Sequence, residues 1–278
     1  MERGEKIVKR IDTAKEAKQN PSYFEALVEL LFQLADDDFI ISFRGSEWLG
    51  LAPHIEEDVA LSSITQNTMG HASLYYHLLE DLDIGNADKL AHERQAVERR
   101  NASYFERKNG EGSYLQEPYY DWALTVVRQF LFETMKKVKL ETIINSSYQP
   151  LADIANKVLM EQPYHLAHWR MWLKQLLGST EEAQNKVQFQ LEAAWPACAD
   201  IIGLGPKAFE LEKHHLIAGE DYLRKQWLKE LEQSLSLPSS LFVDNHPARG
   251  RYGEHTADLD QALSTLSEVY NSDQKAVW

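Results

Sequence analysis

Residues 161–165 form the segment of this sequence with the clearest potential for chemistry. They read Glu-Gln-Pro-Tyr-His, which places a carboxylate and an imidazole four positions apart. Residues four apart share one face of a helix, so Glu161 and His165 can point in the same direction. Four-helix carboxylate proteins hold two iron ions with similar pairs, but their spacing is Glu-x-x-His. The extra residue, and Pro163 with its expected kink, make this an imperfect version of an iron-binding pair.

A di-iron site needs further ligands from the other three helices of such a bundle, namely two single glutamates and a second Glu/His pair. The carboxylates neutralise two hard cations, and the imidazoles complete their coordination. One candidate here has the wrong chemistry, because Asn67 occupies the position of a bridging carboxylate and a neutral amide does not replace its charge. The candidate residues of this incomplete site are Glu47, Asn67, His71, Glu133, Glu161 and His165.

Two interpretations of these residues stay open from the sequence. In one, they bind metal and the chain is an oxidase or oxygenase. In the other, they form a metal-free polar network inside the bundle, with Glu133 or Glu161 bonded to Arg128, Gln129 or a histidine, and such a network fixes helix register without catalysis. The missing charge at Asn67 favours the second interpretation. It predicts no catalytic residue, no cofactor and no metal in this chain.

The elements that must position these residues are long helices. Apolar residues recur at helical spacing through most of the chain, and glycine and proline are scarce. We allow for an interruption of the first helix at residues 36–38, which are three aspartates, and we find no alternation that predicts a strand. The ranges expected to be helical are about 21–48, 56–81, 118–140, 149–177, a fifth from 179–182 to just before Pro196, and 219–234 and 256–270.

The order of these helices predicts the fold class. Residues 86–113 are very polar and join the second long helix to the third, with room for a short helix of their own. One long connection between helices B and C of a bundle is the ferritin-like arrangement. We therefore predict an all-α protein: a ferritin-like four-helix bundle with a long B–C crossover and extra C-terminal helices. Residues 1–20 are expected to be a charged N-terminal extension, and 21–278 a single domain.

The charge of the chain limits its partners. Its 278 residues carry a formal net charge of −14, which disfavours binding to nucleic acid or to an anionic membrane. Residues 1–20 do not resemble a signal peptide, and no apolar run approaches the length that spans a bilayer. We expect a cytoplasmic protein. The basic segment 89–108 is a candidate for binding an anion or an acidic partner, although its intermixed glutamates favour a solvated connection.

Several stretches resemble the C subunit of phenylacetyl-CoA epoxidase, also called ring 1,2-phenylacetyl-CoA monooxygenase. Residues 44–53 are similar to the Arg-x-x-Glu-Trp-x-Gly-x-Ala-Pro stretch of that family. The resemblance covers most of the chain from about residue 30 onward. Two positions depart from the family pattern, since Asn67 replaces an aspartate and His71 replaces a glutamine. The other matching residues are Glu56, Asp58, Ala60-Leu61, Ile64, Gly70, Arg128-Gln129-Phe130, Glu161, Tyr164-His165-Leu166, His255-Thr256, Leu259 and Trp278.

The resemblance implies a specific function. Members of this family are ferritin-like subunits of a bacterial multicomponent monooxygenase of phenylacetate catabolism. A paralogous A subunit holds the di-iron centre, a separate reductase supplies electrons from NADPH, and the substrate is phenylacetyl-CoA. The C subunit lacks a complete ligand set and pairs with A as a structural partner. We therefore expect a non-catalytic subunit that binds the A subunit, and that also forms a homodimer or higher oligomer.

The alternative is a self-contained di-iron or di-manganese carboxylate oxidase or oxygenase that uses the candidate residues directly. A metal-storage or sensor bundle is a third class, but the sequence shows no cage or effector site for it.

Overall fold

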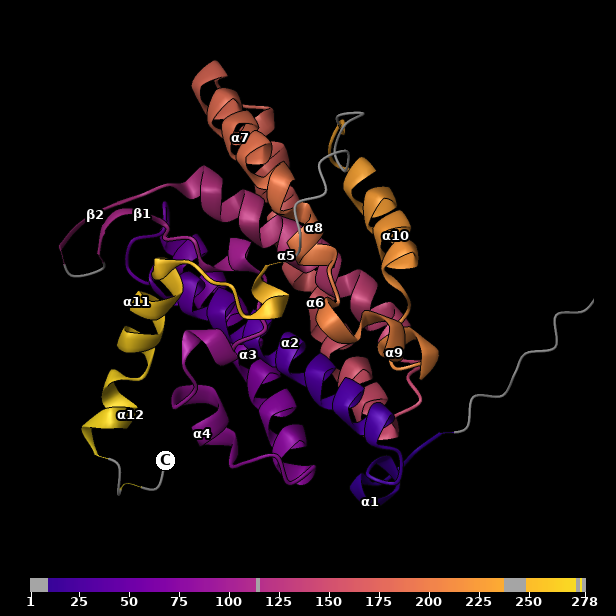
Figure 1. Ribbon diagram of the computed structural model, residues 1–278. Coiled ribbons are helices and arrows are strands. Elements are labelled where there is room, and N and C mark those ends of the chain that lie inside the picture. The colour runs from indigo at the N-terminus through magenta and orange to yellow at the C-terminus, as the bar shows by residue number, and fades with distance from the viewer. Residues whose placement is uncertain (1–9, 114–115, 238–248, 274–275, 277–278) are drawn as a thin grey trace, which may run out of the picture.

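The computed structural model describes residues 10–113, 116–237, 249–273 and 276. Four long helices form its bundle: α2 (Pro21–Ser46), α3 (Ile55–Asp81), α5 (Trp122–Ile143) and α6 (Gln149–Leu177) (Figure 1). α2 packs along α3, α5 packs along α6, and α3 contacts α6. This confirms the predicted all-α, ferritin-like bundle with its long crossover between the second and third long helices.

Local chemistry sets the ends of these helices. The Asn20 side chain accepts a hydrogen bond from the backbone N–H of Tyr23, and Pro21 takes the first position of α2, where its missing N–H leaves no bond unmade. The Asp121 side chain caps α5 by accepting from two backbone N–H groups. α6 continues as a helix through Pro163.

The crossover contains short elements: helix α4 (Ala87–His92), the 3-10 turns η1 (Ala96–Glu98) and η2 (Ser103–Glu106), and an antiparallel hairpin of β1 (Gly110–Ser113) and β2 (Gln116–Tyr120). The expectation of no strands was wrong at this hairpin. Gly112 has φ +81°, and a Cβ there would lie 2.4 Å from the carbonyl oxygen of Glu117. Close backbone pairing at glycine, without side-chain alternation, is what forms this hairpin, so the usual pattern is missing.

Further helices surround one side of the bundle. α7, α8 and α10 pack on α5, whereas α9 and α11 pack on α2. α2 and α5 are consequently buried around most of their circumference, while α3 and α6 each keep a solvent-facing side. The bounds of the additional elements are α1 Ala14–Ala17, α7 Glu181–Ala194, η3 Trp195–Ala197, α8 Cys198–Ile202, η4 Gly205–Lys207, α9 Ala208–Lys213, α10 Glu220–Glu232, η5 Gly250–Tyr252, α11 Ala257–Leu266 and α12 Glu268–Ser272.

The N-terminal segment is attached to this body in its described part. Ile11 pairs with the chain before α6, because its N–H donates to Ser147 O at 2.8 Å and its carbonyl accepts from Gln149 N at 2.9 Å. Residues 1–9 lie outside the described part. Within the described residues, none of the helices combines the length and the hydropathy that crossing a bilayer would need.

Three consecutive aspartates in the middle of α2 are buried, and α2 runs through them without the interruption that the sequence allowed for. Asp36 binds the Arg94 guanidinium at 2.8 and 2.9 Å. Asp37 binds Arg251 at 2.7 and 2.9 Å. Successive helical residues point about 100° apart, so the neighbouring carboxylates reach different segments of the chain. The helix remains regular here because each buried charge has a cation beside it.

The Asp36 pair corrects the interpretation of the basic segment 89–108. Arg99 is fully buried and its guanidinium lies 3.3 Å from Asp36 Oδ1, so Arg94 and Arg99 belong to the interior. The segment is therefore neither a wholly solvated connection nor an open anion site. Burial on its own raises the pKa of Asp36, but the Arg94 and Arg99 guanidinium groups outweigh it and lower the pKa to about 2.

We expect Asp36→Asn to lower the free energy of unfolding at neutral pH by about 3–5 kcal/mol, because two buried guanidinium groups lose their counter-charge. The folded pKa lies below the unfolded one, so this charge stabilises the fold above about pH 4 and stops doing so as the pH falls toward about 2. The difference in the free energy of unfolding between the wild type and the variant should therefore decrease over that pH range. Urea unfolding at several pH values measures it.

Asp83→Asn is the matched control, since Asp83 forms an exposed ion pair with Lys18. The free energy of unfolding of that variant should stay close to the wild-type value. A loss for Asp36→Asn no larger than that of the control would contradict the account.

Candidate functional site: a polar network at the centre of the bundle

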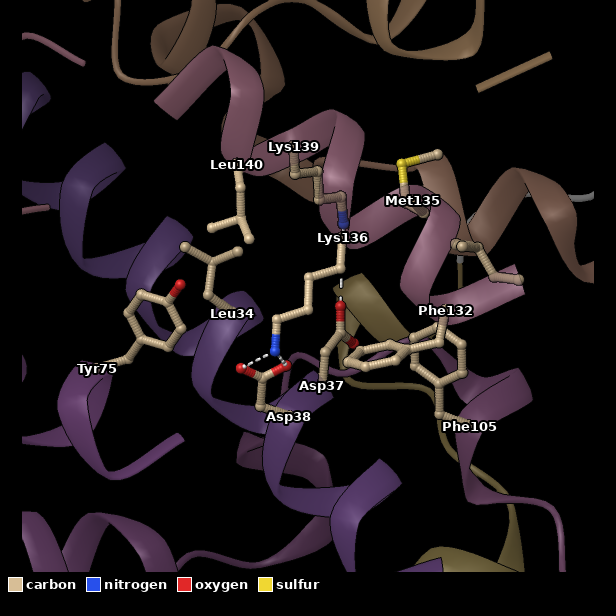
Figure 2. A pocket seen from close by; sticks show the side chains of 11 residues that line it. Leu34, Asp37, Asp38, Tyr75, Phe105, Phe132, Met135, Lys136, Lys139 and Leu140 are labelled. Atoms are coloured by element: carbon tan, nitrogen blue, oxygen red, sulfur yellow. Dashed lines mark hydrogen bonds and ion pairs between the residues drawn. The ribbon is translucent and has the colours of Figure 1, made fainter. Parts of the chain in front are cut away.

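Lys136 of α5 lies at the centre of the candidate site. Its Nζ is 2.8 Å from both carboxylate oxygens of Asp38 and 3.0 Å from His71 Nδ1. Figure 2 shows this side chain reaching from α5 to Asp38 on α2, with Lys139 directed toward Asp37 beside it. Burial raises the pKa of Asp38 to about 7, although the Lys136 ammonium acts in the opposite direction. An ammonium group therefore joins α2, α3 and α5 in the interior.

His71 extends this chain of contacts to α6. Its Nε2 lies 3.0 Å from Glu161 Oε2. Burial lowers the pKa of His71 to about 2, and the Lys136 charge acts in the same direction, so the ring is neutral at neutral pH. An ammonium can only donate, so Nδ1 of this ring accepts from Lys136 and Nε2 carries the proton that is donated to Glu161.

His165 belongs to a second set of contacts. Its Nδ1 lies 3.2 Å from Glu133 Oε1, and its Nε2 lies 3.4 Å from Asn67 Nδ2. The Asn67 N–H donates to Nε2, so Nδ1 is the protonated nitrogen and donates to Glu133. Gln162 Nε2 also donates to the backbone carbonyl of Glu133 at 2.7 Å. The two imidazole rings are close, with centroids 6.1 Å apart.

These contacts determine how well the residues fit a metal. Coordination requires a free lone pair on an imidazole nitrogen. In both rings the lone pair already accepts a hydrogen bond, from Lys136 in His71 and from Asn67 in His165. The ammonium would also repel a second cation. Across residues 10–113, 116–237 and 249–273, no three His, Cys, Asp or Glu side chains form a group that could hold a metal ion. The arrangement does not fit a di-iron centre.

The structure brings five of the six candidate residues together and places the sixth elsewhere. Glu47 caps the end of α2, where it binds Arg44 at 3.1 Å and Asn109 at 2.9 Å. Arg44 in turn donates to the carbonyl of Glu106 and thereby fastens the crossover to α2. Glu47 thus helps to hold the connection in place and makes no contact with the central network.

Asp38 and Lys136 are the residues of the network that sequence reasoning missed. Asp38 lies on α2, the helix from which Glu47 had been proposed. Lys136 follows Glu133 by three positions and so shares its face of α5. The available signal was a set of charges, Asp36 to Asp38 and Lys136, placed within otherwise apolar helices. Such charges need partners of opposite sign if the helices are buried.

A small cavity borders the network. It has a volume of about 20 Å³ and is lined by Asp38 and Lys136 together with Tyr75, Phe105 and Phe132, among others (Figure 2). That space suffices for about one water molecule, whereas ligand pockets usually measure roughly 300–1,000 Å³. Burial lowers the pKa of Lys139 at its edge to about 7. The cavity has no room for an aromatic substrate.

Comparison with known proteins identifies the family of this chain. The phenylacetic acid catabolic protein family matches residues 5–278, and the chain belongs to this family. The C subunit of 1,2-phenylacetyl-CoA epoxidase from Escherichia coli (strain K12) is 25% identical over 254 residues, which cover 89% of this chain and 98% of that protein. The resemblance noted in the sequence is thereby confirmed.

We expect Lys136→Met to lower the free energy of unfolding by about 3–5 kcal/mol, because it leaves the Asp38 carboxylate buried without a counter-charge. The double variant Asp38→Leu/Lys136→Met removes both charges and should recover most of that loss. The single variant Asp38→Leu completes the cycle, and urea unfolding of the wild type and these three variants gives the coupling energy.

The control is Lys207→Met, which removes an exposed ion pair with Glu25. It should change the free energy of unfolding little. A double variant no more stable than Lys136→Met would show that the charge pair is not what holds the network.

Proposed function

We propose that this chain is a non-catalytic structural subunit of a bacterial multicomponent phenylacetyl-CoA epoxidase. In this role it pairs with the di-iron catalytic A subunit and stabilises it during phenylacetate degradation. The chain itself carries no cofactor in this proposal: the A subunit holds the iron, and a separate reductase delivers electrons from NADPH.

The observation that carries the proposal is the hydrogen bonding of Lys136. Its ammonium lies inside the bundle, where it donates to Asp38 and to the candidate ligand His71. A fixed lysine charge balances Asp38 without metal and occupies a lone pair of His71, so in this proposal the bundle keeps its fold without oxygen chemistry.

Two further facts support a role within a larger enzyme. The relative from Escherichia coli is itself named as one subunit of an epoxidase. The cavity beside the network, about 20 Å³, does not accommodate a phenyl ring. A chain that keeps the bundle, but has neither a free ligand set nor room for the substrate beside the central network, is suited to supporting a catalytic partner.

The experiment is reconstitution of the epoxidase from this chain, the A subunit encoded in the same genome and their reductase. We expect NADPH oxidation that depends on phenylacetyl-CoA only when the A subunit is present. Glu133→Gln in this chain keeps an acceptor for His165 and should leave turnover of the complex essentially unchanged, because Glu133 binds no reacting atom here.

The corresponding substitution of an iron-binding glutamate in the A subunit is the positive control and should abolish turnover. If Glu133→Gln in this chain removed turnover while the complex stayed folded and assembled, the non-catalytic assignment would be wrong. The alternative of a self-contained di-iron or di-manganese enzyme would then gain support.

A further inference from the structure

One side of the bundle is unusual in its lack of charge. Residues 59–79, which make up most of α3, contain no Asp, Glu, Lys or Arg, although 26% of the whole chain is charged. The exposed residues of this stretch are small, apolar or uncharged, and they include Ser62, Ser63, Gln66, Gly70 and Ser73. A solvent-facing helix side normally carries charges.

The neighbouring side of α6 continues this surface. The contacts of His71 with Glu161 and of Asn67 with His165 set residues 67–71 of α3 opposite residues 161–165 of α6. Large apolar side chains project from both helices along this pair. Their exposed fractions are 72% for Ile55, 66% for Val59, 68% for Met160, 78% for Tyr164 and 51% for Met171. We call this surface the α3–α6 face.

The other helices of the fold leave this face open. The main neighbours of α3 are α2, α6 and α4, which follows it in the chain, and those of α6 are α5, α3 and α7, which follows it. The further C-terminal helices pack on α2 and α5. Within the described residues, the fold therefore covers the α2 and α5 side and leaves the α3–α6 face in solvent.

The composition of the face matches the centre of a protein interface, where charged residues are depleted and aromatic residues and methionine are enriched. The face is not free of charge, because Lys157 is exposed one turn before Glu161. A single lysine there does not make the basic surface that nucleic acid or an anionic membrane needs, and the net charge of −14 disfavours both. A second copy of this chain is a poor fit. A two-fold interface pairs the same patch with itself, so it would bring together two chains of net charge −14 each.

We propose that the α3–α6 face is the surface on which this chain binds the catalytic A subunit. This inference rests on the proposed function and assigns the place of contact. The partner presents an uncharged helical surface, with a hydrogen-bond donor or cation opposite Glu161. That carboxylate already accepts from His71, so the contact connects the interface with the interior network.

The test uses two disruptive variants and one matched control. Gly70→Arg adds bulk at a position where a Cβ meets nothing within 4 Å, so the fold should tolerate it. Tyr164→Arg changes an aromatic side chain that is 78% exposed, and the control Phe209→Arg changes one that is 72% exposed on α9. Circular dichroism and urea unfolding establish that all three variants fold.

Binding to the A subunit is measured by co-expression with size-exclusion chromatography and by titration calorimetry of the purified chains. We expect Gly70→Arg and Tyr164→Arg to weaken binding by about 30-fold or more, as at an interface centre, and Phe209→Arg to bind like the wild type. Equal binding by all variants would overturn the assignment of the face and leave the proposed function standing.

Two other results have different meanings. If the wild-type chain formed no complex with the A subunit, the proposed function would fail and the inference with it. If light scattering showed that the isolated chain dimerises and that Gly70→Arg abolishes the dimer, a second copy would be the occupant of this face and our choice of partner would be wrong.

Discussion

The fold depends on three consecutive carboxylates buried at the middle of α2. Asp36, Asp37 and Asp38 leave the helix in different directions and bind cations from the crossover, the C-terminal segment and α5 respectively. Removing water from these charges is unfavourable unless each has a partner, so the sequence that places them in α2 also requires three distant segments to converge there. The same constraint places Lys136, and hence its hydrogen bond to His71.

Lys136 links this constraint to function. A di-iron bundle balances its interior carboxylates with metal, whereas here the ammonium binds Asp38 and His71. Neutral His71 in turn donates a hydrogen bond to Glu161, which is half-exposed on the α3–α6 face. The interior therefore specifies one arrangement of the four long helices, and two of them, α3 and α6, present the face that we assign to the partner.

The long helices were predictable because their apolar spacing reports which side is buried, and α6 and α7 begin and end close to their predicted positions. The hairpin was not predictable, because glycine and backbone pairing form it without alternating side chains.

The candidate site was predicted in part. Helical spacing identified five of its residues, which are Asn67, His71, Glu133, Glu161 and His165. Asp38 and Lys136 were missed, since their pairing joins positions 98 residues apart, and Glu47 was placed in the site although it caps α2. Arg44 and Glu47 of the family motif bind each other and fix the crossover to α2. His255 also fixes the crossover, because it binds the buried Glu106.

The most direct measurement is diffraction at the iron absorption edge from crystals of this chain soaked anaerobically in excess ferrous salt at neutral pH. The account predicts no anomalous peak among Asp38, His71, Glu133, Glu161 and His165, and electron density for the Lys136 side chain within hydrogen-bond distance of Asp38. Anomalous peaks bound by these carboxylates and imidazoles, with Lys136 turned away, would contradict it.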